Sequence, residues 1–333
     1  MSRSHSTRPA HAASAKDVEF FRNKISAAAS FVVTEAALLR EDSAECGGTY
    51  PASGIISYAQ NREDILLWRA LRDLREGFYI DVGAEDPTQD SVTRAFYERG
   101  WHGINVEPVQ GHFDKLCTER PRDLTFQVAI GDRVGWTTLY EFPDTGLSTL
   151  VKEVASRHQS NGLRYVERRV PIVTLTNLWE DFVEGEVHFL KIDVEGYEPQ
   201  VLNGMALARF RPWIIIIEAT EPRTSEETWY EWEDKILESQ YEFVHFDGLN
   251  RWYLAAERSQ LKYRFDAPPN LFDQFELATT MAVRNRLAVA EHELEQIRES
   301  ASWRWTAPLR AVRDGVCRLV ERLSVKRPGR RTV

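Results

Sequence analysis

The chain has 333 residues, few cysteines and no long apolar run. Its three cysteines, Cys46, Cys117 and Cys317, are scattered and lack the paired spacing of a metal site, which is typical of reduced cysteines in a cytoplasmic protein. No segment approaches the roughly 20 apolar residues that span a bilayer. The N-terminus is rich in Ser, Arg, His and Ala and has no apolar segment of the secretory type. We therefore expect a cytoplasmic protein.

A G-x-G-x-x-G turn is also missing from the first predicted strand and its turn. Residues 78–87 read FYIDVGAEDP, in which an aromatic and β-branched run ends at Asp81 and a turn follows at Gly83. A strand, a glycine turn and a helix form the first unit of a doubly wound α/β sheet, whose ligands bind at the carboxyl ends of its strands. Without further glycines the turn is not suited to a pyrophosphate. It favours a nucleoside-type cofactor without phosphates, with S-adenosylmethionine as the leading candidate.

The net charge of −9 is distributed unevenly along the chain. From Trp303 onward, nine Lys or Arg residues stand against Asp314 and Glu321, a local net charge of +7, so the first 302 residues carry −16. An acidic body argues against nucleic acid as the main partner.

Strand-like and helix-like segments alternate between residues 57 and 275. Predicted strands lie at 78–82, 102–106, 124–130, 188–192 and 213–218, and predicted helices at 91–99, 111–117, 176–182 with Thr176 as its cap, from 197 onward, and 225–239. Segments 241–245 and 251–255 predict a closing antiparallel hairpin, and 136–140 with 164–173 a further hairpin or edge element. The pattern predicts an α/β fold with a doubly wound, mainly parallel sheet and antiparallel closing strands.

Two extensions flank this region. Residues 1–50 are expected to form a partly disordered N-terminal extension, and residues 276–333 a helical C-terminal extension. Apolar residues of the second extension recur in a short heptad-like stripe made of Val283, Leu287, Ala290, Leu294 and Ile297. The helix that follows is amphipathic and rich in arginine. Residues 303–333 therefore predict peripheral contact with the inner face of the cell membrane, or equally contact with a protein.

Acidic residues follow the first three predicted strands. Asp81 is placed to organise the ammonium or ribose side of S-adenosylmethionine, and Gly83 allows close backbone approach, although an Asp81 that only caps the turn is an equal alternative. Glu107 ends the second strand, where a doubly wound fold places the acid that accepts hydrogen bonds from the ribose hydroxyls. Asp132 is placed to meet the adenine amino group, with a simple turn role in Gly-Asp-Arg as its competitor.

The densest acidic segment is KIDVEGYE, residues 191–198. In an extended chain Asp193 and Glu195 point the same way, into the cleft at the end of the fourth strand, and Glu218 at the end of the fifth strand can converge on them. Two roles fit Asp193 and Glu195: a general base for an attacking hydroxyl, or part of a Mg²⁺ site that lowers the pKa of a hydroxyl. The metal ligands would be Asp193 and Glu218.

Several segments together resemble the FkbM family of S-adenosylmethionine-dependent methyltransferases. They cover roughly residues 57–275 and occur in the family's order: SYAQNREDILLWRAL (57–71), FYIDVGAEDPTQDSVTRAFYERGWHGINVEP (78–108), DTGLSTL (144–150), HFLKIDVEGYEPQVLNG (188–204), RPWIIIIEAT (211–220) and FDGLNRWYL (246–254). Such an ordered set is far more specific than a single glycine motif.

The resemblance implies a class I Rossmann-like methyltransferase that modifies a hydroxyl, often on a sugar or polyketide-like acceptor. Asp81 and Gly83 match the family's first cofactor motif, Glu107 its ribose acid, and residues 193–196 its Asp-Val-Glu-Gly block. One departure is Glu85, which stands where many relatives have Asn. Residues 302–310 are similar to a helical segment of bacterial surface-polysaccharide glycosyltransferases, which implies polysaccharide biosynthesis and a glycan acceptor.

Two other functions use the same observations. A doubly wound fold also suits an NAD-dependent oxidoreductase, although the first turn lacks the glycines for a pyrophosphate. A non-catalytic scaffold of polysaccharide assembly would use the heptad-like stripe and the basic tail to recruit enzymes to a membrane.

Overall fold

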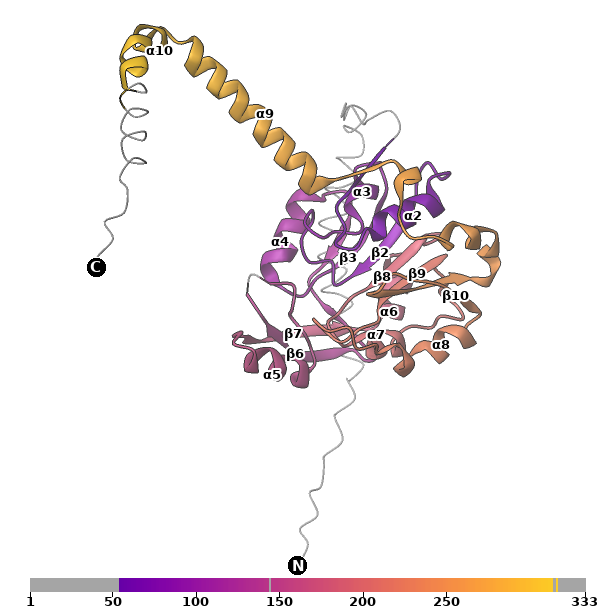
Figure 1. Ribbon diagram of the computed structural model, residues 1–333. Coiled ribbons are helices and arrows are strands. Elements are labelled where there is room, and N and C mark those ends of the chain that lie inside the picture. The colour runs from indigo at the N-terminus through magenta and orange to yellow at the C-terminus, as the bar shows by residue number, and fades with distance from the viewer. Residues whose placement is uncertain (1–53, 144, 314–315, 317–333) are drawn as a thin grey trace, which may run out of the picture. The chain divides into compact units, whose positions relative to one another are not determined.

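The computed structural model describes residues 54–143, 145–313 and 316 (Figure 1). Its main element is a seven-stranded sheet in the order β10-β11-β9-β8-β2-β3-β4. The pairs β8–β9, β2–β8, β2–β3 and β3–β4 are parallel, whereas β11 runs antiparallel to both neighbours. The strands are β2 (Phe78–Val82), β3 (His102–Val106), β4 (Leu124–Phe126), β8 (Phe189–Ile192), β9 (Ile214–Glu218), β10 (Tyr241–Phe246) and β11 (Asn250–Ala255). The predicted mainly parallel sheet with an antiparallel closing hairpin is confirmed.

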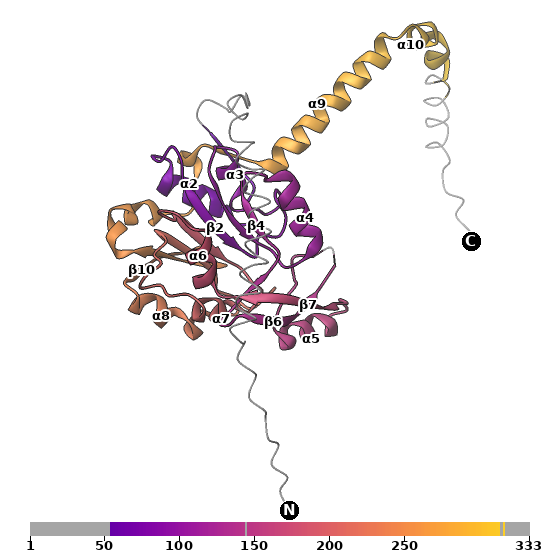
Figure 2. The ribbon, with the colours of Figure 1, turned by 180° about the vertical axis from the view of Figure 1, so that it is seen from behind.

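Helices cover both faces of this sheet because alternate side chains of each strand point to opposite faces. On one face Tyr79, Phe189 and Ile216 pack with α2 (Glu63–Leu71) and α3 (Arg94–Tyr97). On the other face Ile80, Leu190 and Ile217 pack with α6 (Leu175–Phe182), α7 (Glu198–Asn203) and α8 (Glu233–Glu238). Figures 1 and 2 show the resulting three layers from opposite sides. All five residues of β9 are buried, as its run of isoleucines predicts.

A small second sheet lies beyond the carboxyl ends of the central strands (Figure 1). Its order is β5-β7-β6, with β5 (Ala129–Ile130) parallel and β6 (Gly135–Glu141) antiparallel to β7 (Val166–Val173). Helix α5 (Lys152–Ser160) follows β6, and α4 (Gln110–Glu119) follows β3. Further short elements are β1 (Ile55–Ser57) and β12 (Phe275–Leu277), which pair with each other, and the 3₁₀ turns η2 (Trp229–Glu231), η3 (Ala256–Phe265) and η4 (Leu271–Asp273). The small sheet supplies one wall of the pocket described below.

Three predicted elements are corrected by the structure. The predicted strand 124–130 is two strands in two sheets, because β4 pairs with β3 while Ala129 of β5 pairs with Ile172 of β7. The predicted helix 225–239 is reduced to η2 and α8, because the backbone of Trp232 leaves helical geometry where its side chain enters the core. The predicted helix 91–99 is reduced to α3, because Asp90 has a left-handed backbone and Thr93 turns its hydroxyl to Asp81.

The cap of α6 is also corrected. Thr174 caps this helix by accepting a hydrogen bond from the amide of Asn177 at 3.1 Å. Thr176 lies inside the helix, where its hydroxyl accepts a hydrogen bond from the amide of Ala206.

The chain divides into two units after Glu276, and the second unit is considered by itself. It contains α9 (Ala278–Glu299) and α10 (Ala301–Trp305). The predicted heptad-like stripe lies on α9. Within the described residues no helix is both long and apolar enough to cross a membrane. The predicted N-terminal extension and most of the predicted basic tail fall outside the described residues, so the membrane or partner contact of residues 303–333 stays a prediction.

Candidate active site

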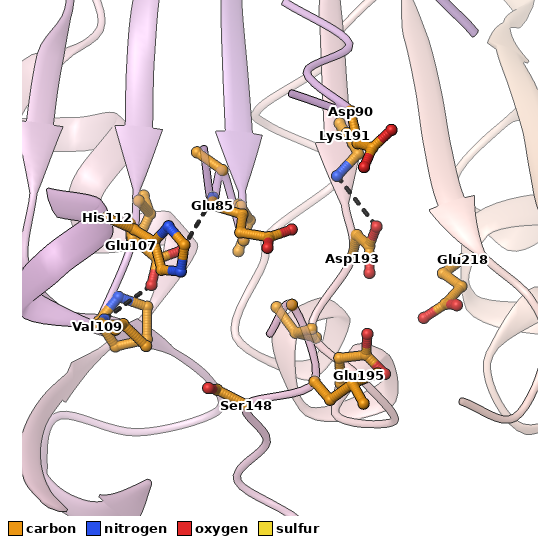
Figure 3. Close-up of a pocket in the computed structure, with 18 of the residues that line it drawn as sticks. Glu85, Asp90, Glu107, Val109, His112, Ser148, Lys191, Asp193, Glu195 and Glu218 are labelled. Carbon is orange, nitrogen blue, oxygen red and sulfur yellow. Dashed lines mark hydrogen bonds and ion pairs between the residues drawn. The ribbon is translucent and has the colours of Figure 1, made fainter. Parts of the chain in front are cut away.

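A pocket of about 450 Å³ lies at the carboxyl ends of β2, β3, β8 and β9. This volume is in the range of small-molecule sites. Its lining includes Val82 and Val106 from the strand ends and Leu139 from the small sheet. Six carboxylates also line it, those of Glu85, Asp90, Glu107, Asp193, Glu195 and Glu218. Figure 3 shows Glu107 on one side of the pocket and Glu195 with Glu218 on the other, which we call the Glu107 end and the Glu195–Glu218 end.

The turn after β2 requires glycine at position 83. Gly83 has a φ of 81°, and its amide donates a hydrogen bond to the carbonyl of Val106 at 3.0 Å. A Cβ atom at this position would lie 1.8 Å from the backbone carbonyl oxygen of Asp193. The turn therefore packs directly against the chain that follows β8, and it brings the ends of two neighbouring strands together.

Glu107 is held in place by two backbone amides. Its carboxylate accepts hydrogen bonds from the amide of Val109 at 2.7 Å and from that of Glu85 at 2.9 Å, one on each oxygen (Figure 3). Burial raises the pKa of Glu107 to about 7, although these two hydrogen bonds act to lower it. Each carboxylate oxygen still has a lone pair to accept from a ligand hydroxyl. This geometry fits a cis-diol such as a ribose.

A buried lysine bridges two of the predicted site residues. The ammonium of Lys191 lies 3.2 Å from a carboxylate oxygen of Asp193 and 3.7 Å from one of Asp81. These carboxylates raise the pKa of Lys191 against the opposing effect of its burial. Asp81 does not line the pocket; it is buried below it, where its other oxygen accepts from the hydroxyl of Thr93 at 3.1 Å. Asp81 therefore contacts Lys191 and Thr93 rather than the pocket.

The Glu195–Glu218 end carries carboxylate oxygens that the described part of the chain leaves without a hydrogen-bond partner. They are Oε2 of Glu195 and Oε2 of Glu218, both buried. Burial, followed by the charges of Asp193 and Glu198, raises the pKa of Glu195 to about 9. Burial and the charges of Asp193 and Glu195 likewise raise the pKa of Glu218 well above its ordinary value. Buried carboxylates without partners are costly, which is typical of a site that a ligand completes.

The loop that presents Glu195 is fixed by its neighbours. Glu195 has a φ of 55° and Gly196 a φ of 93°, so two successive residues are left-handed. The carbonyl of Glu195 accepts from the hydroxyl of Thr149 at 2.8 Å. The carboxylate of Glu198 accepts from the amides of Val194 and Gly196, which gives this first residue of α7 a structural role. A strained backbone held this firmly is characteristic of functional loops.

The structure places the predicted site residues unequally. Gly83, Glu107, Asp193, Glu195 and Glu218 line one pocket. Asp132 does not line it: its side chain is 42% exposed, and it pairs with Arg133 at 3.1 Å. In this structure the Asp132 side chain is therefore engaged by its neighbour rather than by the pocket, as expected of an acid in a Gly-Asp-Arg turn.

A metal site is not evident in the described part of the chain. It contains no group of three or more His, Cys, Asp or Glu side chains arranged to hold a metal ion. The predicted ligands Asp193 and Glu218 both line the pocket, but Asp193 is already paired with Lys191.

Sequence reasoning missed two residues that shape the site. Lys191 lies in the acidic segment 191–198 and no role was predicted for it, although a lysine inside a buried apolar strand is itself a signal, because such a charge needs partners. No binding role was predicted for Glu85, yet its backbone amide donates a hydrogen bond to the carboxylate of Glu107. Glu85 has a left-handed backbone, with a φ of 49°. A left-handed backbone at Glu85 is not visible in the sequence, because glutamate adopts this conformation less readily than asparagine.

The fold and the pocket define a class of protein. A seven-stranded sheet with one antiparallel strand next to its edge, a glycine turn after the first central strand and an acid at the end of the second are the features of a class I methyltransferase. Residues 81–245 match the methyltransferase FkbM domain. The chain therefore carries an FkbM-family S-adenosylmethionine-dependent methyltransferase domain, and the NAD-dependent alternative is set aside.

The chain is also similar to two solved structures. A TehB-like SAM-dependent methyltransferase from Corynebacterium glutamicum has 9% sequence identity and a TM-score of 0.33, and the match covers 68% of this chain and 98% of that one. An O-methyltransferase from Bacillus cereus in complex with SAH has 14% identity and a TM-score of 0.25, over 58% of this chain and 66% of that one. No curated protein matches.

Proposed function

We propose that this methyltransferase transfers its methyl group to a hydroxyl oxygen, on a sugar or surface-glycan acceptor. The observation that carries the proposal is the pocket's asymmetry. Its Glu107 end is complete and suits a ribose, whereas its Glu195–Glu218 end offers carboxylate oxygens without partners, as a hydroxyl acceptor and its departing proton require.

The chain's residues fit the cofactor in two respects. Gly83 lines the pocket in a turn that only glycine allows to pack against Asp193, and Glu107 is oriented to accept from both hydroxyls of a ribose. When bound, S-adenosylmethionine supplies a methyl group on a positively charged sulfur, which is a good leaving group. The chain then has to orient the acceptor, exclude water and receive one proton.

Glu195 is better suited than Asp193 to receive that proton. The carboxylate of Asp193 is already engaged by the ammonium of Lys191 at 3.2 Å. Glu195 has an oxygen without a partner and a pKa raised by burial, so it is the stronger base once a cationic cofactor has favoured its ionisation. S-adenosylmethionine would supply the methyl group to the acceptor oxygen and keep the electron pair of the carbon–sulfur bond, and Glu195 would receive the hydroxyl proton. The ion pair between Asp193 and Lys191 fixes the start of the loop that carries Glu195 and contributes to the electrostatic potential of the pocket.

The test combines cofactor binding with turnover. The full chain is incubated with labelled S-adenosylmethionine and host glycan extracts, and the products are analysed for O-methyl groups. We expect Glu195→Gln to lower turnover by about 10²-fold or more, as for loss of a general base. Asp193→Asn should lower turnover less while leaving cofactor affinity nearly intact. Glu226→Gln is the matched control, since Glu226 is exposed and does not line the pocket. Label on nitrogen, or a wild-type rate in Glu195→Gln, would overturn the assignment.

Metal dependence is tested in the same assay. A Mg²⁺ ion held by Asp193 and Glu218 would make turnover sensitive to EDTA and restorable by Mg²⁺. Full activity in EDTA would leave Glu195 to act as a base without a metal.

A further inference from the structure

The charge around the pocket is strongly unbalanced. Six carboxylates line it, and Asp81 lies buried just below. Lys191 is the cation at its centre, and it is already shared between Asp81 and Asp193. Arg223 also lines the pocket but stands at its exposed rim. S-adenosylmethionine carries one net positive charge, so the carboxyl groups at the Glu195–Glu218 end can ionise together only if a further cation joins the cofactor.

Glu218 is the carboxylate for which this matters most. It ends β9 after four buried isoleucines, is only 7% exposed, and lines the pocket (Figure 3). Its Oε2 atom has no hydrogen-bond partner among the described residues. Beside a neutral ligand the Glu218 carboxyl would stay protonated, whereas a ligand ammonium would favour its carboxylate form and donate hydrogen bonds to the open oxygen.

We propose that Glu218 binds a protonated amine of the acceptor, so that the acceptor class is amino sugars and amine-bearing glycans. The inference rests on the proposed function, since it assigns a further group on the same acceptor. Glu195 receives the proton of the attacking hydroxyl, and Glu218 holds the nearby ammonium, which stays protonated and is not methylated. The amine thereby fixes which hydroxyl faces the cofactor.

The experiment measures sugar binding by saturation-transfer NMR with the full chain saturated with S-adenosylhomocysteine. Glucosamine and glucose are the probes, because they differ by one ammonium in place of one hydroxyl. We expect glucosamine to bind about tenfold more tightly at neutral pH, as for a partly desolvated charge-assisted hydrogen bond. Glu218→Gln should remove the preference, and Glu226→Gln should keep it.

The outcomes separate the two proposals. Calorimetry with S-adenosylhomocysteine shows whether each variant is folded and binds the cofactor product; absence of binding by the wild type would argue against the proposed function. With that binding intact, equal affinity for the two sugars, binding of neither, or an unchanged preference in Glu218→Gln would overturn the amine proposal. A Glu218→Gln variant that loses affinity for S-adenosylmethionine but not for S-adenosylhomocysteine would assign Glu218 to the sulfonium instead, and would overturn it as well.

A second inference comes independently from α9. Its apolar stripe repeats with spacings of four and three residues, and its large members are half or more exposed: Val283 64%, Leu287 57%, Leu294 51% and Ile297 50%. With Leu287 and Leu294 at position a, and Val283, Ala290 and Ile297 at position d, the stripe has the spacing of a short coiled-coil seam.

Charges flank this seam in a complementary pattern. Arg286 and Glu293 occupy successive g positions. Glu291 and Arg298 occupy the e positions that follow them. Arg286, Glu291 and Glu293 have no oppositely charged residue three or four positions away on their own helix. Across two parallel helices, Arg286 meets Glu291 and Glu293 meets Arg298; across two antiparallel helices, Arg286 meets Glu293.

We infer that α9 pairs with α9 of a second copy of this chain. Sedimentation equilibrium of the full chain over a range of concentrations should show reversible self-association, which Arg286→Glu weakens in either orientation. Adding Glu291→Arg restores a parallel pair, and adding Glu293→Arg restores an antiparallel pair. A monomer at all concentrations, or rescue by neither second change, would overturn the inference.

Discussion

The two ends of the pocket differ in how complete they are. At the Glu107 end both carboxylate oxygens accept from backbone amides, so the acid is oriented before any ligand arrives. At the Glu195–Glu218 end, oxygens of two carboxylates have no partner among the described residues. The first arrangement suits a group such as a ribose, which is the same in every turnover. The second suits a ligand whose own polar groups complete the site. The predictions below are ordered by the size of the effect on this contrast.

The largest effect is expected from Gly83→Ala, which acts where both ends meet. The new Cβ would clash with the carbonyl of Asp193 at 1.8 Å, and φ of 81° is unfavourable for alanine. We expect a loss of about 2 to 4 kcal/mol in the free energy of unfolding, with cofactor binding abolished. Chemical denaturation and calorimetry measure the two effects.

Gly100→Ala is the matched control for this change. Gly100 has a φ of 88°, but a Cβ there would meet nothing within 4 Å. Its cost should be limited to backbone strain of about 1 kcal/mol, without loss of cofactor affinity. Equal costs at both positions would show that the close approach to Asp193 is unimportant.

The next effect is on cofactor affinity. Glu107→Ala removes the acceptor for the ribose hydroxyls and leaves the amides of Val109 and Glu85 without their partner. We expect the Kd for S-adenosylmethionine to rise at least about tenfold, as for loss of a charge-assisted hydrogen bond. Asp114→Asn on exposed α4 is the control, and calorimetry is the measurement. An unchanged Kd would remove the cofactor from the Glu107 end.

The Glu195–Glu218 end should make the free energy of unfolding depend on pH. Because burial raises the folded-state pKa of Glu195 from 4.5 to about 9, its proton stabilises the folded chain below pH 4.5, and that stability is lost as the pH rises toward 9. Glu195→Gln cannot ionise. We expect this variant to gain on the wild type between pH 5 and pH 9 by at least about 1.4 kcal/mol, the value of a one-unit shift in pKa, measured by chemical denaturation without ligand. A pH-independent difference would contradict the raised pKa.

Some strands of the fold could be predicted from the sequence and others could not. Strands β2 and β3 were predicted residue for residue, because alternation, β-branched residues and glycine turns agree there. The prediction of one strand over 124–130 was wrong, because the chain changes sheet within this segment. That change depends on a pairing with Ile172, more than 40 residues away. Local patterns do not contain such pairings.

The predictions of site residues likewise divide into those that local patterns support and those that depend on distant pairings. Strand ends brought Glu107, Asp193 and Glu218 to one edge as expected, because the carboxyl ends of parallel strands coincide. Asp132 falls outside the pocket although Ala129 and Ile130 of the preceding strand β5 line it, because the Asp132 side chain is engaged by Arg133. The bridge from Lys191 to Asp81 depends on register, since these two residues are paired across β2 and β8.

The smallest expected effect tests why Glu85 is strained. Its φ of 49° is favourable for asparagine and unfavourable for glutamate, and burial raises the pKa of Glu85 in an already acidic pocket. Glu85→Asn should therefore raise the free energy of unfolding by about 0.5 to 1 kcal/mol, while its amide still donates to Glu107. Gln274→Asn, at a φ of 52° outside the pocket, provides the control and should give a similar gain. If Glu85→Asn is stabilised but binds S-adenosylmethionine more weakly, the Glu85 carboxylate itself contacts the cofactor; if it is destabilised, the left-handed backbone at this position does not strain the fold.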